Sequence, residues 1–247
     1  MNSSSVQRRI GFWAVVCLLL ALTKNLAWSA DRYLIAPVTL ENSVSIPSKV
    51  ADALNSQGWM LYTQSYGVRE EICEIFLAKT LPQAGAGSAS GKTSYGKIEK
   101  GSFVGIIHLL PEATEDYSAD FHNQALRPGY YSLRYAVMPA GTYENGTKMG
   151  DFVVLSQLSM DPDPNRVLSE AELNRFGAAT SGSDVAASME LMPPAASAHG
   201  AADIKVDETD LCIFQVQVQL RAGKTRSSEK LTLAIGLFTP IHEAEGS

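Results

Sequence analysis

The segment Leu211–Leu220 constrains the fold more than any other part of the sequence. Its residues, LCIFQVQVQL, place Gln215, Gln217 and Gln219 at every second position among apolar side chains. Successive side chains of a β-strand point to opposite faces of a sheet, so this alternation predicts a strand with one wet and one buried face. The polar stretch AGKTRSSEK and the apolar run LTLAIGLF follow, which predicts a hairpin with a long loop.

Short apolar or alternating runs recur along the rest of the chain, separated by turn residues. They predict about nine strands, near residues 33–40, 58–64, 71–81, 102–110, 129–138, 151–158, 188–192, 211–221 and 230–238. Helical spacing of apolar residues is found at 170–178 and again at 48–56. The sequence therefore predicts an all-β protein, an antiparallel β-sandwich or jelly roll with one or two short helices.

Two segments rich in small residues interrupt the strand pattern. Residues 83–96 and 178–203 contain mainly Gly, Ala, Ser and Pro, apart from the ASMELM core of the second segment, so we expect mobile loops there. An apolar content of 45% is sufficient for a substantial core. We therefore expect residues 30–247 to form a single β-sandwich domain.

Residues 1–29 have the layout of a secretory signal peptide. Two arginines precede an apolar run at residues 10–22, and small residues at Ala27 and Ser29 favour cleavage after Ser29. Cleavage after Ala30 is the second choice, and a retained signal anchor is the other alternative. Because a spanning helix needs about 20 apolar residues, we expect no membrane span after cleavage. The mature protein is expected in the periplasm or outside the cell.

The charge balance narrows the choice of partners. The chain has 20 basic and 26 acidic residues, and removal of the first 29 residues takes away three basic ones, which leaves 17 − 26 = −9. An acidic surface repels phosphates, so nucleic acid and anionic membranes are not expected partners. A glycan or another protein is the alternative, and the candidates for stacking on such a ligand are the tyrosines expected to face solvent: Tyr62, Tyr66, Tyr117, Tyr130 and Tyr143.

Two cysteines remain in the mature sequence, Cys73 and Cys212. Both lie in apolar strand patterns on the side expected to face inward. Export makes a disulfide between them chemically feasible, whereas two separate buried thiols explain the same pattern. The sequence leaves both alternatives open, because spacing along the chain does not show whether the two sulfurs come within bonding distance.

The stretch DPDPNRVLSEAE carries oxygen-bearing side chains at spacings similar to those of a calcium-binding EF-hand loop. Asp161, Asp163, Asn165 and Glu172 occupy positions one, three, five and twelve. An arginine stands at position six, where the loop needs glycine, and two prolines stiffen the turn. The favoured interpretation is a helix start, in which Ser169 and Glu172 form a capping box, and the calcium loop is the alternative. No other cofactor is suggested by the sequence.

Evidence for catalysis in the sequence is sparse. The histidines form no closely spaced pair that would start a zinc site, and no G-x-S-x-G nucleophile motif is present. A metal-dependent hydrolase remains an alternative if His108, Asp116, Asp120 and His122 converge in space. The favoured hypothesis is an exported, non-catalytic β-sandwich module with a binding or structural role in the envelope or outside the cell.

The phrase LRPGYYSLRY, residues 126–135, sets a Pro-Gly turn ahead of an alternating strand. Together with SYGVR, FVGIIH and MGDFVVL ahead of an Asp-Pro-rich turn, it resembles a group of uncharacterised secreted bacterial proteins over roughly residues 58–180. The chain departs from that group where Met149, Gly150 and Asp151 run together, because relatives carry several more residues there. The resemblance implies export and a β-rich fold, and it implies no activity or catalytic residue.

Overall fold

The computed structural model describes residues 32–40, 46–65, 68–85, 93–111, 120–122, 124–139, 149–194, 202–207, 211–221 and 228–238. The predicted signal peptide and the centre of the first predicted loop lie outside the described residues. Within the described part of the chain, no helix combines the length and the apolar character needed to cross a membrane.

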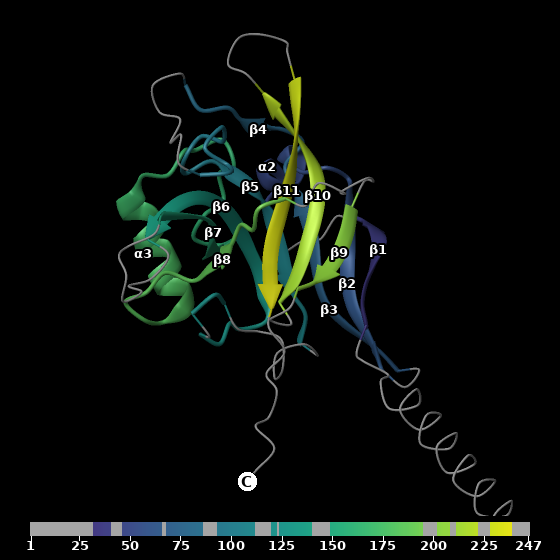
Figure 1. Cartoon of the computed structure of the whole chain (residues 1–247). Helices are drawn as coiled ribbons and strands as arrows, with labels where there is room; N and C mark the ends of the chain where they lie inside the picture. The colour runs from purple at the N-terminus through teal and green to yellow at the C-terminus, as the bar shows by residue number, and fades with distance from the viewer. Residues whose placement is uncertain are drawn as a thin grey trace, which may run out of the picture.

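Two β-sheets pack face to face, which confirms the predicted all-β sandwich (Figure 1). The seven-stranded sheet has the order β1-β2-β3-β5-β6-β7-β8, and its neighbouring strands are antiparallel. Its strands are β1 (Arg32–Thr39), β2 (Gln57–Ser65), β3 (Val68–Leu77), β5 (Phe103–Leu109), β6 (Gly129–Pro139), β7 (Met149–Gln157) and β8 (Ser188–Glu190).

The four-stranded sheet is built around the alternating segment of residues 211–220. Strand β10 pairs antiparallel with β11 and β9, and in parallel with the short β4. The strands are β4 (Leu81–Pro82), β9 (Ala202–Val206), β10 (Cys212–Arg221) and β11 (Ser228–Phe238). All nine predicted strands are present, and β4 and β9 are additional. Both were missed because β4 spans two residues and β9 begins inside the segment predicted as a loop.

Apolar side chains from both sheets fill the space between them. The Trp59 ring packs against the Phe214 ring, with centroids 5.5 Å apart, and joins β2 to β10. Tyr95, fully buried, donates its hydroxyl hydrogen to the Met192 carbonyl at 2.8 Å and accepts the Ala234 amide at 3.0 Å. This tyrosine therefore ties the end of the seven-stranded sheet to β11.

Two helices accompany the sheets in the described part of the chain. Helix α3 (Glu170–Ser181) lies beside β6 and β7, as Figure 1 shows at the left of the molecule, and the shorter α2 is Ser48–Ala53. Both lie where helical spacing predicts them. Gly177 allows α3 to approach β7 closely, because a Cβ added there would come within 2.9 Å of Val154 Cγ1. Helix α3 therefore covers the part of the seven-stranded sheet over β6 and β7 and leaves the rest of that face open to solvent.

Candidate functional site

The outer face of the seven-stranded sheet, the face turned away from β10, divides into two halves. The Trp59 side chain points inward to Phe214, so Met60 and Tyr62, at odd offsets from Trp59, point outward. We call the part over β2, β3, β5 and the start of β6 the open half. The part over the rest of β6 and β7, beneath α3 and residues 159–169, is the covered half.

A row of three side chains crosses the open half. The strand register places Glu74 of β3 beside His108 of β5, and His108 beside Tyr130 of β6. The His108 Nδ1 atom lies 2.9 Å from a Glu74 carboxylate oxygen, and the His108 and Tyr130 rings stack with centroids 3.8 Å apart and planes 7° apart. The imidazole and the carboxylate each keep 20% of their side-chain surface exposed. The row is therefore held in place yet accessible.

A second aromatic group lies on the same face over β2 and β3. The Arg69 guanidinium carbon is 3.8 Å from the centroid of the Tyr62 ring, and the same guanidinium pairs with Glu71 at 3.3 Å. Both charged side chains are about half exposed, so their ion pair contributes little to stability. Arg69 instead holds the tyrosine ring in one orientation.

A surface hollow of about 320 Å³ adjoins Tyr130 at the start of β6. Gly129 and Gln157 also line it, and so does Ser159 at the end of β7. The open half thus offers two oriented aromatic rings, hydrogen-bond donors and acceptors beside them, and a recess next to one ring. Such a combination suits a planar or weakly amphipathic ligand that lies across the strands.

The structure places two of the five tyrosines proposed from the sequence on this one face. Tyr62 and Tyr130 are both half-buried there. Tyr66, Tyr117 and Tyr143 lie outside the described residues. Strand register, not sequence proximity, brings Glu74, His108 and Tyr130 together, so the sequence alone gave no signal for this row.

The twelve-residue stretch proposed as a calcium loop forms a helix start. Glu172 accepts the Ser169 amide at 2.9 Å, and Ser169 Oγ accepts the Glu172 amide at 3.4 Å, which completes a capping box. The Ser169 amide, and then its hydroxyl, lower the pKa of Glu172 by hydrogen bonding to the carboxylate. Asn165 contributes its amide N–H to Asp163 at 3.1 Å, as in a turn.

Asp161, the first of the proposed calcium ligands, is engaged by an arginine. Both carboxylate oxygens accept hydrogen bonds of 2.7 Å from the Arg134 guanidinium, and Ser132 Oγ donates to one of them at 2.6 Å. A calcium ion would have to displace a buried cation from this carboxylate. Among the residues that the structure describes, no three acidic, histidine or cysteine side chains form a metal-binding group. The geometry therefore favours the cap over the calcium loop.

The residues proposed for a hydrolase do not form one centre. Asp120 accepts the Ser188 amide of β8 at 3.1 Å and lies 3.5 Å from His122, whereas His108 belongs to β5. Three strand spacings separate β5 from β8, roughly 14 Å. Metal ligands must approach one ion to about 2 Å, so His108 cannot join the Asp120 and His122 pair. Asp116 lies outside the described residues.

Cys73 and Cys212 both lie in the core between the sheets, and both are free thiols in this structure. Burial raises the pKa of the Cys73 thiol, and the neighbouring Cys212 raises it further. Burial also raises the pKa of Cys212, to about 12. The structure thus shows two separate buried thiols, one of the two alternatives that the sequence left open. The raised pKa values keep both thiols in their unreactive protonated form.

Comparison of the chain with known protein families, with characterised proteins and with solved structures finds no match.

Proposed function

We propose that the protein is an exported, non-catalytic binding module and that the open half of the seven-stranded sheet binds a saccharide chain. The observation that carries the proposal is the presence of Tyr62 and Tyr130 on one accessible sheet face, each ring oriented by a stacked neighbour. Rings that are already oriented lose little conformational entropy when a ligand stacks on them.

The spacing and polarity of the face favour a sugar over a protein partner. Tyr62 and Tyr130 stand three strand spacings apart, roughly 14 Å, which is about the reach of a short oligosaccharide. Glu74, His108 and Arg69 lie between or beside the rings and can hydrogen-bond sugar hydroxyls. A protein partner would instead favour a patch of large apolar side chains, and the described exposed ones come from separate parts of the chain: Val68, Phe121, Met160, Val167, Val185 and Val206.

Binding can be tested by calorimetry with three neutral hexasaccharides, chitohexaose, cellohexaose and maltohexaose. We expect at least one to bind, and we expect Tyr62→Ala and Tyr130→Ala each to weaken it about tenfold, because a lost stacking contact is worth roughly 1 kcal/mol or more. Val206→Ala, on β9 of the other sheet, removes an exposed apolar side chain and serves as control. Unchanged affinity in both tyrosine variants would exclude this face as the site.

The export part of the proposal rests on the predicted signal peptide of residues 1–29. Intact mass measurement of the protein recovered from the periplasm or the medium tests it directly. We expect a chain that begins at Ala30. A full-length chain retained in the membrane fraction would support the signal anchor instead.

A further inference from the structure

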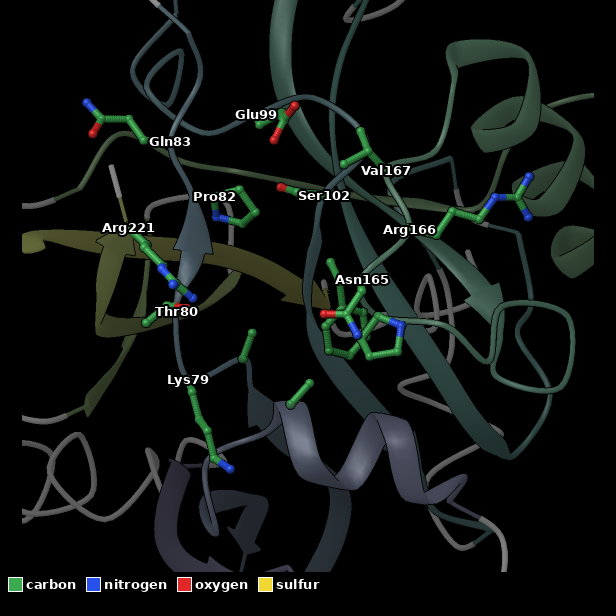
Figure 2. A pocket seen from close by; sticks show the side chains of 14 residues that line it. Lys79, Thr80, Pro82, Gln83, Glu99, Ser102, Asn165, Arg166, Val167 and Arg221 are labelled. Atoms are coloured by element: carbon green, nitrogen blue, oxygen red, sulfur yellow. The ribbon is translucent and has the colours of Figure 1, made fainter. Parts of the chain in front are cut away.

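A cavity of about 430 Å³ lies beside the start of β5, at the end of that strand opposite to His108 (Figure 2). Five parts of the chain meet around it: the end of α2, strand β4, residues 99–103, the segment 164–167 and the end of β10. Its volume is in the usual range for small-molecule sites. The polar and charged residues that line it are Lys79, Thr80, Gln83, Glu99, Ser102, Asn165, Arg166 and Arg221.

The cavity carries positive charge on a protein that is acidic as a whole. Lys79, whose Nζ donates to the Asp52 carbonyl at 2.6 Å, and Arg221 stand against a single acidic residue, Glu99, whereas the chain has a net charge of −6. Arg166 does not add to this charge, because its guanidinium pairs with Glu172, and Figure 2 shows it directed away from the cavity. Within the described residues the Arg221 guanidinium has no hydrogen-bond or ion-pair partner. An available arginine in a recess favours an anionic ligand.

A buried hydroxyl points to the same site independently. Ser102 is 1% exposed, and its Oγ has no hydrogen-bond partner among the described residues. Figure 2 shows this oxygen directed into the cavity, between Pro82 and the segment that carries Asn165. A buried hydroxyl without a partner costs folding free energy, so its presence in a cavity suggests that a ligand supplies the missing hydrogen bond.

The backbone holds this hydroxyl and the cavity wall in fixed positions. The Ser102 amide donates to the Glu99 carbonyl at 3.2 Å, and the Tyr135 amide donates to the Ser102 carbonyl at 3.0 Å. Across the cavity, Arg134 donates to the carbonyl oxygen of Arg166 at 2.5 Å. The Gln83 amide donates to the Arg221 carbonyl at 3.1 Å, which fixes β4 beside β10. The site is therefore largely formed before any ligand arrives.

We propose that this cavity binds a small hydroxylated anion of about monosaccharide size, a sugar acid or a sugar phosphate. Arg221 pairs with the carboxylate or phosphate of the ligand, Lys79 adds a second positive charge, and Ser102 Oγ hydrogen-bonds a ligand hydroxyl. The proposal stands independently of saccharide binding on the open half, because the two sites share no residue.

The test uses calorimetry on the mature protein with glucuronate, glucose 6-phosphate, neutral glucose and inorganic phosphate. We expect one of the two sugar anions to bind at least tenfold more tightly than glucose or inorganic phosphate, and the better of the two identifies the charged group. Arg221→Gln should weaken that ligand at least tenfold. Arg175→Gln removes the same charge from the surface of α3 and should leave the affinity unchanged, as should Tyr62→Ala on the open half.

Ser102→Ala separates a binding role from a structural one. If the hydroxyl serves a ligand, this variant melts at the same temperature as the wild type or higher without ligand, and its ligand-induced rise in melting temperature is smaller. A lower melting temperature with unchanged affinity would show that Ser102 is structural and would overturn the proposal. Absence of binding by both sugar anions at millimolar concentration, or full affinity in Arg221→Gln, would overturn it as well.

Discussion

The covered and open halves of the seven-stranded sheet belong to one face of one sheet, and both carry charged side chains. On the covered half the Arg134–Asp161 pair is buried, at 0% and 2% side-chain exposure, and is joined by two hydrogen bonds of 2.7 Å. On the open half the Glu74–His108 pair keeps 20% exposure and is joined by one contact. The buried Arg134–Asp161 pair stabilises the fold, whereas the partly exposed Glu74–His108 pair remains accessible to a ligand.

The covered half depends on Arg134 because this side chain bonds to several residues of one segment. Arg134 donates to Asp161 and also to the carbonyls of Asp163 and Arg166, so one guanidinium anchors residues 161–166 over β6. The Tyr62–Arg69 contact of the open half joins only neighbouring strands. The two halves should therefore respond very differently to the loss of one side chain.

The largest effect is expected for Arg134→Met. The change leaves the Asp161 carboxylate buried without a cation, which should lower the free energy of unfolding by about 3–5 kcal/mol. Urea denaturation followed by circular dichroism measures this. The double variant Arg134→Met with Asp161→Leu removes both charges and should recover part of the loss. A loss below about 1 kcal/mol in the single variant would contradict the contrast between the halves.

A smaller loss is expected from a methyl group at Gly101. This glycine has φ of 81°, and a Cβ there would come within 1.9 Å of the Leu168 carbonyl oxygen, so residues 161–168 would have to move. We expect Gly101→Ala to cost about 3 kcal/mol in thermal or urea unfolding. Gly182→Ala is the matched control, because Gly182 also has positive φ, 70°, but open space around it, and should cost about 1 kcal/mol.

Ser169→Ala removes the cap of α3, the helix over the covered half, and should cost about 1 kcal/mol. The cap needs ionised Glu172, whose pKa is lowered in the folded state. Its contribution is therefore complete above the usual glutamate pKa and is lost as pH falls through the lowered value. The stability difference between wild type and variant should narrow only at acidic pH. Adding calcium should leave both melting temperatures unchanged, whereas a rise in both would support the calcium loop.

The smallest effect is expected on the open half. Glu74→Gln breaks a partly exposed pair with His108, so the free energy of unfolding should change by less than about 1 kcal/mol. The same urea experiment gives the value. A loss as large as that of Arg134→Met would mean that the Glu74–His108 row is structural, and would remove the basis for assigning it to a ligand.

The strands could be predicted because each one carries its own periodicity. The alternation in β10 places Gln217 and Gln219 outside as expected, yet Gln215 is buried at 3% exposure beside β9. The sequence around β9 shows no alternation, so the pairing of that strand with β10 beside Gln215 could not be predicted. A local pattern of side chains predicts that a strand forms. Which strands pair with it depends on the rest of the chain.

The functional geometry was less predictable than the fold. The helix start at Ser169 could be predicted because the capping box depends only on the spacing of Ser169 and Glu172. The Glu74–His108–Tyr130 row and the cavity wall of Ser102 and Arg221 depend on pairing between distant strands. Arg134 stands in the predicted strand near residues 129–138, and nothing in the local sequence indicates that it would form a buried pair with Asp161.

The parallel pairing of β4 with β10 also bears on how the chain reaches its native state. Leu81 lies beside Leu220, 220 − 81 = 139 positions further along the chain. Contacts between such distant residues carry a high entropic cost for loop closure, and folds dominated by them form slowly, on the order of milliseconds to seconds. The second sheet cannot close until the C-terminal hairpin has been synthesised. Truncation before β10 would therefore leave the inner face of the first sheet exposed to aggregation.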